Sequence, residues 1–259
     1  HMRVMNRSEL ESPDAEAIPS LDNSMGPETE RLGATIRWRD PSTRVQIGFE
    51  SSRQRNEVMR WLSKGQRPGA PGRLQAEYPH LFSGDPATVP VTLFVADQPV
   101  AFCMLWAVHF RVRIARIRVG LISLVYTDPA ARGQGFATRV VEAAIAHAEE
   151  LALGLILLWS DLERLYRPLG FHRAGRESLL MLDAATLDTA IRETRILPDL
   201  TIEAAQPADW VEIERLRGYR TSQLELDAGE ITRARTIPDL NARVARNDEG
   251  VWIASLCSQ

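Results

Sequence analysis

The sequence predicts a mixed α/β fold, in which a central mixed sheet is flanked by helices. An antiparallel meander of apolar, alternating segments comes first, between about residues 45 and 108. The order strand, helix, strand, helix, strand follows between Leu121 and Leu182. The composition is that of a globular protein, with 44% hydrophobic and 25% charged residues among 259. That length accommodates one large domain or two small ones.

Charge and cysteine content exclude several classes of partner. The formal net charge of -3 and the pI near 6.0 give no reason to expect nucleic acid. Two cysteines, Cys103 and Cys257, indicate neither a disulfide framework nor a zinc site, so no metal is expected. No apolar run has membrane-spanning length and no signal peptide is visible, so we expect a cytoplasmic protein without membrane contact.

The first 34 residues differ from the rest of the chain. They hold three basic and seven acidic residues, with little apolar periodicity. We expect residues 1–34 to be a disordered tail, in which His1-Met2 resembles a remnant of an expression tag. Structure is expected to begin near Thr35.

The next segment is typical of a strand, a helix and a hairpin. A half-buried strand is predicted at 45–49, and Ser51 or Ser52 is a suitable N-cap for a helix to about Ser63. A Gly/Pro loop follows, and residues 74–85 have no clear pattern. Residues 91–96 and 100–108 are predicted as strands joined by Asp97-Gln98-Pro99, with Cys103 a small buried hydrophobic residue of the second strand.

Arg111 to Arg118 is an arginine-rich segment with strand-like alternation. We predict a strand with Arg111 and Arg113 on one face and Arg116 and Arg118 on the other. A solvated or edge strand is one interpretation, and an arginine face for phosphate or an acidic substrate is the other.

The stretch from Leu121 to Ala137, LISLVYTDPAARGQGFA, dominates the sequence. An apolar strand ends at Asp128-Pro129, a glycine-containing loop follows, and a helical pattern starts at once. Because the first N–H groups of a helix have no internal partners and its dipole favours negative charge, this arrangement predicts an anion site. Glycine at 133 and 135 would let a phosphate approach the backbone.

Two familiar phosphate loops do not match this stretch. The P-loop needs Gly-Lys-Ser/Thr, whereas the one lysine of the chain is the distant Lys64. The dinucleotide fingerprint needs a third Gly or Ala where Thr138 stands, although Asp161 lies at a suitable distance downstream. An ordinary strand–helix turn remains a further interpretation of the stretch.

After the strand, Arg132, Gly135 and Ala137 form the pattern Arg-x-x-Gly-x-Ala, which resembles the acetyl-CoA signature of the GNAT N-acetyltransferases. Tyr166-Arg167-Pro168-Leu169-Gly170-Phe171 resembles their second signature, Tyr-x-x-x-Gly-Phe. A helix at about 136–152, ended by Gly154, and a buried strand at 155–159 separate the two motifs. The resemblance implies a GNAT domain over residues 35–190, with a sheet that splays where Leu121–Thr127 and Leu155–Trp159 separate.

The resemblance also implies acetyl-CoA as cosubstrate and direct acetyl transfer to a primary amine that remains unidentified. Tyr166 stands at the family's general-acid position, and a Tyr packed under the loop is the alternative. The base is not identified: Glu50, Glu77 and Asp161 are candidates, although a surface or capping carboxylate is the favoured interpretation of each. The implied acetyl-CoA contacts are Val125, Thr127, Arg132, Gly133, Gln134, Gly135, Phe136 and Ala137.

Two questions about the acceptor remain open. Trp106 and Trp159 are read either as core aromatic residues or as walls of an apolar acceptor pocket. A non-catalytic acyl-CoA-binding or protein-interaction module on the same fold is the alternative function.

Residues 199–259 resemble the start of another GNAT domain, without a second Arg-x-x-Gly-x-Ala. A strand at about 201–205, a helix from Trp210 and a strand at 251–254 are predicted, and an unrelated helical extension is the alternative. This segment is expected to dock on the first domain and extend its sheet, to form a homodimer, or to belong to a longer domain. We favour docking.

Overall fold

The computed structural model describes residues 2–6, 35–37, 42–174, 201–220, 222–238, 241–246 and 252–258. Its elements up to residue 127 are β1 (Met2–Asn6), β2 (Thr35–Arg37), β3 (Thr43–Ile47), α1 (Ser52–Gln66), α2 (Arg73–Glu77), β4 (Thr88–Val95), β5 (Gln98–Val112) and β6 (Ala115–Thr127). The next elements are η3 (Pro129–Ala131), α3 (Phe136–Glu150), β7 (Leu155–Trp159), α4 (Glu163–Tyr166), η4 (Arg167–Leu169) and β8 (His172–Arg173).

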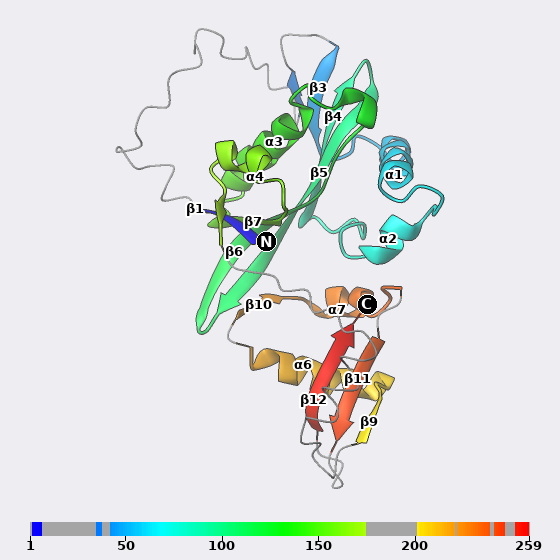
Figure 1. Cartoon of the computed structure of the whole chain (residues 1–259), viewed down its shortest axis with the longest axis vertical. Coiled ribbons are helices and arrows are strands. Elements are labelled where there is room, and N and C mark those ends of the chain that lie inside the picture. Colours follow the sequence, from blue (N-terminus) through cyan, green and yellow to red (C-terminus); the bar gives the residue numbers. More distant parts are fainter. Residues whose placement is uncertain are drawn as a thin grey trace, which may run out of the picture.

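The main sheet is mixed, as the sequence predicted. Its strand order is β2-β3-β4-β5-β6-β7-β1-β8, and every neighbouring pair is antiparallel except β6 and β7 (Figure 1). A parallel pair needs a long crossover connection, and α3 supplies it. The expected α/β architecture is therefore confirmed.

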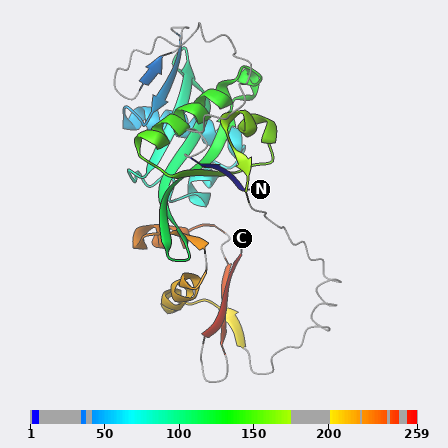
Figure 2. The same cartoon turned by 90° about the vertical axis from the view of Figure 1, so that its left-hand side faces the viewer.

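Each face of the sheet has its own apolar core. α3 covers one face with Val140, Val141, Ala144, Ile145 and Ala148, which meet alternate residues of β3 to β7. The opposite face carries α1 and α2 (Figure 1, Figure 2), and its core includes Val58, Leu62 and Leu74. Alternation along the strands supplies both cores, since successive side chains point to opposite faces.

Three local features differ from the sequence-based expectations. Arg111 to Arg118 is not one strand, because β5 and β6 form a long hairpin that turns at Arg113-Ile114, with Arg113 at φ 54°. α3 ends at Glu150, so Gly154 does not terminate it, and Ala152 takes the left-handed conformation (φ 52°). Met2–Asn6 forms β1 within a region expected to be disordered, and it pairs with both β7 and β8.

The C-terminal part contains β9 (Thr201–Ala204), η5 (Pro207–Asp209), α6 (Trp210–Gly218), β10 (Ser222–Glu225), α7 (Ala228–Ala234), β11 (Asn241–Arg246) and β12 (Trp252–Ser258). β9, β11 and β12 form a separate antiparallel sheet. The last strand of the order expected between Leu121 and Leu182 lies outside the described residues, as does the connection from there to residue 200. None of the described helices is long and apolar enough to cross a membrane.

The C-terminal part contacts the first domain through β10. This strand pairs antiparallel with the end of β5, from Ser222↔Val112 to Glu225↔His109, at the lower end of the long hairpin in Figure 1. Arg111 donates to the carbonyl of Gly218 at 2.7 Å, and Arg116 pairs with Glu225. The segment thus extends the sheet of the first domain, which is the docking arrangement we favoured.

Candidate active site

The two parallel strands separate after a short paired region. Pairing runs from Val119↔Leu155 to Leu121↔Leu157 and ends there. β6 continues to Thr127, so among the described residues no strand pairs with Ile122–Thr127 on the β7 side. Unpaired backbone N–H and C=O groups in a sheet are ready to bond an extended ligand. The splay at the predicted position is therefore confirmed.

The loop after β6 has the backbone of an anion site. Asp128 caps the short η3 turn by accepting from the N–H of Ala130 at 3.0 Å. Gly133 and Gly135 are both left-handed, at φ 79° and 77°, and Gly135 is the N-cap of α3. A Cβ added at either glycine would meet nothing within 4 Å, so the conformation, and not local crowding, requires glycine there.

The predicted phosphate-loop residues are accessible. Residues 132–135 are exposed and Phe136 and Ala137 are half-buried. The side chain of Arg132 folds back and donates to the carbonyl of Thr127 at 3.3 Å. A fifteen-residue helix follows directly, so its free N–H groups and dipole face the loop.

A bulge in β6 was not predicted. Phe102 pairs with Tyr126 and Met104 with Ser123, so Cys103 faces two residues, Leu124 and Val125. Leu124 takes φ 52°, and nothing in its sequence neighbourhood signals a left-handed residue. Bulges of this kind re-aim backbone groups beside functional sites.

Two hydroxyls on β6 lack partners. The Oγ of Ser123 and the Oγ1 of Thr127 are buried, and neither has a hydrogen-bond partner within the described residues. Buried polar groups are normally satisfied, so such orphans are typical of a site that a ligand completes. Ser123 and Thr127 lie on either side of the predicted contact Val125, in the part of β6 that no longer pairs with β7.

Tyr166 ends α4 and is almost fully buried. Its side chain is 4% exposed and packs edge-on against Phe171, with ring centroids 5.8 Å apart. The helix begins after Ser160, whose hydroxyl accepts from the N–H of Leu162. Tyr166 also contacts the core that includes α3. This environment fits both the packed-tyrosine interpretation and a phenol shielded from water.

The three candidate bases occupy different surroundings. Glu50 and Asp161 are exposed, and Glu50 lies 3.8 Å from the Arg44 guanidinium. Glu77 binds Arg67 at 2.6 Å and Arg73 at 2.8 Å, and these hydrogen bonds lower the pKa of its carboxyl. A carboxylate held this firmly in its charged form is a weak proton acceptor.

The two tryptophans behave differently. Trp106 is 6% exposed, so the core interpretation is confirmed for it, and its ring packs against His80 with centroids 4.8 Å apart and an interplanar angle of 47°. Trp159 is 51% exposed, so the expectation of core packing is wrong for it. Cys103 is fully buried as predicted, and burial raises the pKa of its thiol.

The family comparison supports the two signatures. Residues 55–171 match the family model described as acetyltransferase (GNAT) family. Within the described residues no group of His, Cys, Asp and Glu could hold a metal ion. The match ends before residue 199, so the second, partial GNAT copy stays a prediction. The comparison with curated proteins finds no match.

Two solved structures share the fold over most of this chain. One is a conserved protein of Enterococcus faecalis V583, described as a probable N-acyltransferase, with 13% identity and a TM-score of 0.59. The other is a GCN5-related N-acetyltransferase from Kribbella flavida, with 16% identity and a TM-score of 0.57. The alignments cover 83% and 84% of this chain, but 55% and 58% of those chains. The chain thus spans little more than half the length of either structure.

Proposed function

Residues 55–171 form a domain of the GNAT acetyltransferase family, and on that basis we propose that the protein transfers acetyl from acetyl-CoA to a primary amine. The observation that carries the proposal is the splay of β6 from β7, followed directly by the left-handed glycine loop and the start of α3. An extended chain could pair with the open edge of β6, and a pyrophosphate at its end could bind the glycine loop and the start of α3. The pantetheine arm would pair with the backbone at Val125 and Thr127.

The pyrophosphate would lie on the amides of residues 133–137. Backbone N–H groups and the α3 dipole favour its negative charge without a lysine. Arg132, exposed at the loop, adds a positive charge beside it. The buried hydroxyls of Ser123 and Thr127 would find partners on the bound arm.

The transfer itself needs one proton removed and one supplied. An alkyl ammonium near pH 7 has no lone pair, so a base must deprotonate the amine before it attacks the thioester carbonyl. We assign to Tyr166 the protonation of the departing thiolate, since a phenol can donate that proton. Attack on the thioester places negative charge on its carbonyl oxygen. Backbone N–H groups at the β6 bulge, together with a backbone N–H near Thr127, would stabilise that charge.

Acetyl-CoA binding and thiol release test the proposal. Calorimetry should show binding to the full chain, and a panel of primary amines should stimulate release of CoA thiol. A β-branched side chain at a left-handed position strains the loop, so Gly135→Val should weaken binding by about tenfold or more. Gly69→Val is the matched control, because Gly69 has φ 79° with nothing within 4 Å and lies in the loop between α1 and α2.

The outcomes separate the two functions. If Gly135→Val binds acetyl-CoA with wild-type affinity, the pyrophosphate does not bind at this loop. Tight acetyl-CoA binding without thiol release for any amine would favour the non-catalytic acyl-CoA-binding module.

A further inference from the structure

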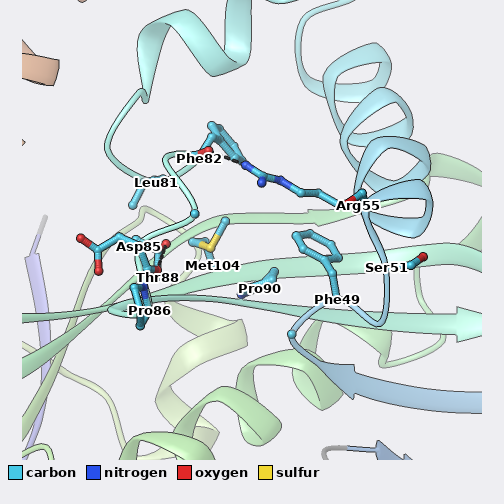
Figure 3. A pocket seen from close by; sticks show the side chains of 13 residues that line it. Phe49, Ser51, Arg55, Leu81, Phe82, Asp85, Pro86, Thr88, Pro90 and Met104 are labelled. Carbon is cyan, nitrogen blue, oxygen red and sulfur yellow. Dashed lines mark hydrogen bonds between the residues drawn. The ribbon is translucent and has the colours of Figure 1, made fainter.

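A pocket of about 380 Å³ lies on the α1 and α2 face of the sheet. The N-terminal turn of α1 forms one wall and the loop between α2 and β4 forms the other, while β4, β5 and the Gly48–Phe49 turn after β3 form the floor (Figure 3). The floor and lower walls are apolar and consist of Phe49, Leu81, Pro90 and Met104. No sequence pattern predicted this pocket, because its walls come from segments that are separated along the chain.

A row of paired strand residues links the pocket floor to the proposed transfer site. Pro90 pairs with Met104 across β4 and β5, and Met104 pairs with Ser123 across β5 and β6. Paired residues of adjacent strands project to the same face, and Met104 belongs to the core under α1 and α2. The row therefore runs along that face to Ser123, two residues beyond the last β6–β7 pair. It spans about 10 Å, since adjacent strands lie about 4.8 Å apart.

A guanidinium crosses the pocket. Arg55 extends from α1 toward the opposite wall, where its Nη2 donates to the carbonyl of Phe82 at 2.6 Å (Figure 3). A guanidinium has five N–H donors, so this bond leaves most of them available. Among the described residues, no carboxylate lies within ion-pair distance of Arg55, although the described part of the chain contains many arginine–carboxylate pairs.

The one acidic residue of the pocket lining does not neutralise Arg55. The carboxylate of Asp85 points away from Arg55 in Figure 3, and it accepts from the N–H of Ala87 at 2.8 Å. It also lies 3.9 Å from the Nη2 of Arg233 in α7. The pocket thus combines an apolar floor with an uncompensated positive charge, which favours an anionic group.

We infer that this pocket binds the acceptor, and that the acceptor has an apolar body and a carboxylate that pairs with Arg55. Its amine would point from Met104 along this row toward Ser123, where the thioester is expected. The inference rests on the proposed function for the identity of the reaction, and direct binding of the two probes tests the pocket independently of it. An elongated amino acid such as 4-(aminomethyl)benzoate suits the length of the floor, and 4-(aminomethyl)benzamide is its neutral isostere.

The test compares these two amines with wild type, Arg55→Gln and Arg55→Lys. A charge-assisted, bidentate hydrogen bond forms between Arg55 and the benzoate but not the benzamide. The kcat/KM of wild type should therefore be roughly tenfold or more higher for the benzoate. Arg55→Gln should reduce the preference to near unity, and Arg55→Lys should retain part of it. Arg60→Gln is the control, because Arg60 lies on the exposed side of α1 and, among the described residues, binds only the carbonyl of Asn56. Acetyl-CoA affinity serves as the folding check.

A wild-type protein without this preference, or an Arg55→Gln variant that keeps it, would overturn the inference. If no amine releases thiol, the proposed function fails, and calorimetry with the two probes then tests the pocket alone. Carboxylate-selective binding that disappears in Arg55→Gln supports the pocket. Equal or absent binding of the two probes to wild type refutes it.

Discussion

The surroundings of Tyr166 make its hydroxyl a useful residue-scale probe. The ring is held by Phe171 and by the core under α3, so removal of the hydroxyl alone leaves most of the packing intact. The Tyr-x-x-x-Gly-Phe spacing predicted this residue from the sequence. It could not predict the burial, which depends on α4 folding back onto β7 and α3.

Tyr166→Phe should keep acetyl-CoA affinity and lower turnover by about 10²-fold or more, the usual effect of losing a general acid. Calorimetry and single-turnover thiol release measure the two quantities separately. If turnover is unchanged while the chemical step limits the rate, Tyr166 is a packing residue.

His80, which packs against Trp106, gives a second prediction at the residue scale. Burial, and then the charge of Arg233, lower the pKa of His80 to about 4, against about 6.5 for a free histidine. As the pH falls below about 6.5, His80 becomes protonated in the unfolded chain but stays neutral in the folded chain. The free energy of unfolding therefore decreases.

We expect the free energy of unfolding of wild type to decrease between pH 7 and pH 5 more steeply than that of His80→Gln, which has no titrating group there. Chemical denaturation at several pH values measures both slopes. In Arg233→Gln the NMR titration of His80 should shift to higher pH. A histidine that titrates near 6.5 in the wild-type protein would contradict this account.

At the scale of elements, the sequence predicted those features that local residue types determine. Asp128-Pro129 and the two glycines marked the end of β6 and the start of α3, and Ser51 marked the start of α1. The turn at Arg113-Ile114 has none of the usual turn residues, so the β5–β6 hairpin was missed. The Leu124 bulge and the pairing of β1 with β7 depend on partners distant in sequence. The same holds for the Arg55 pocket.

The contact between α1 and β6 gives an element-scale prediction. A Cβ on Gly65 would clash with the hydroxyl of Tyr126, whose ring packs edge-on against Trp61 with centroids 5.1 Å apart. Gly65→Ala must therefore move either the Tyr126 ring or the helix. We expect a loss of about 1–3 kcal/mol in the free energy of unfolding, as for other overpacked sites.

Gly218→Ala is the matched control, since Gly218 ends α6 and has nothing within 4 Å of an added Cβ. Denaturant unfolding should leave this variant near wild type. Because Tyr126 lies between Val125 and Thr127, Gly65→Ala should also weaken acetyl-CoA binding. Wild-type stability in Gly65→Ala would show that α1 does not press on β6 as the structure indicates.

At the scale of the whole molecule, the C-terminal part is joined to the first domain by the pairing of β10 with β5 and by polar contacts beyond it. β10 continues the sheet edge beyond β4, whose own pairing with β5 ends at Trp106. Leu224 and Leu226 pack against the core under α1 and α2. Asp85, which lines the Arg55 pocket, lies near Arg233 of α7. The docked C-terminal part therefore contacts, through Arg233, the loop that forms one wall of the pocket.

Leu224→Asp should detach β10, because a carboxylate in this half-buried apolar position would lose its hydration among apolar neighbours. Hydrogen exchange at the amides of His109–Val112 should accelerate, and the melting temperature should decrease. The titration of His80 should move toward 6.5 as Arg233 leaves it. Val211→Asp is the control, since Val211 is 74% exposed on α6 and the same charge costs little there. If exchange at His109–Val112 and the His80 titration match wild type in Leu224→Asp, β10 does not anchor the C-terminal part, and contacts elsewhere hold it in place.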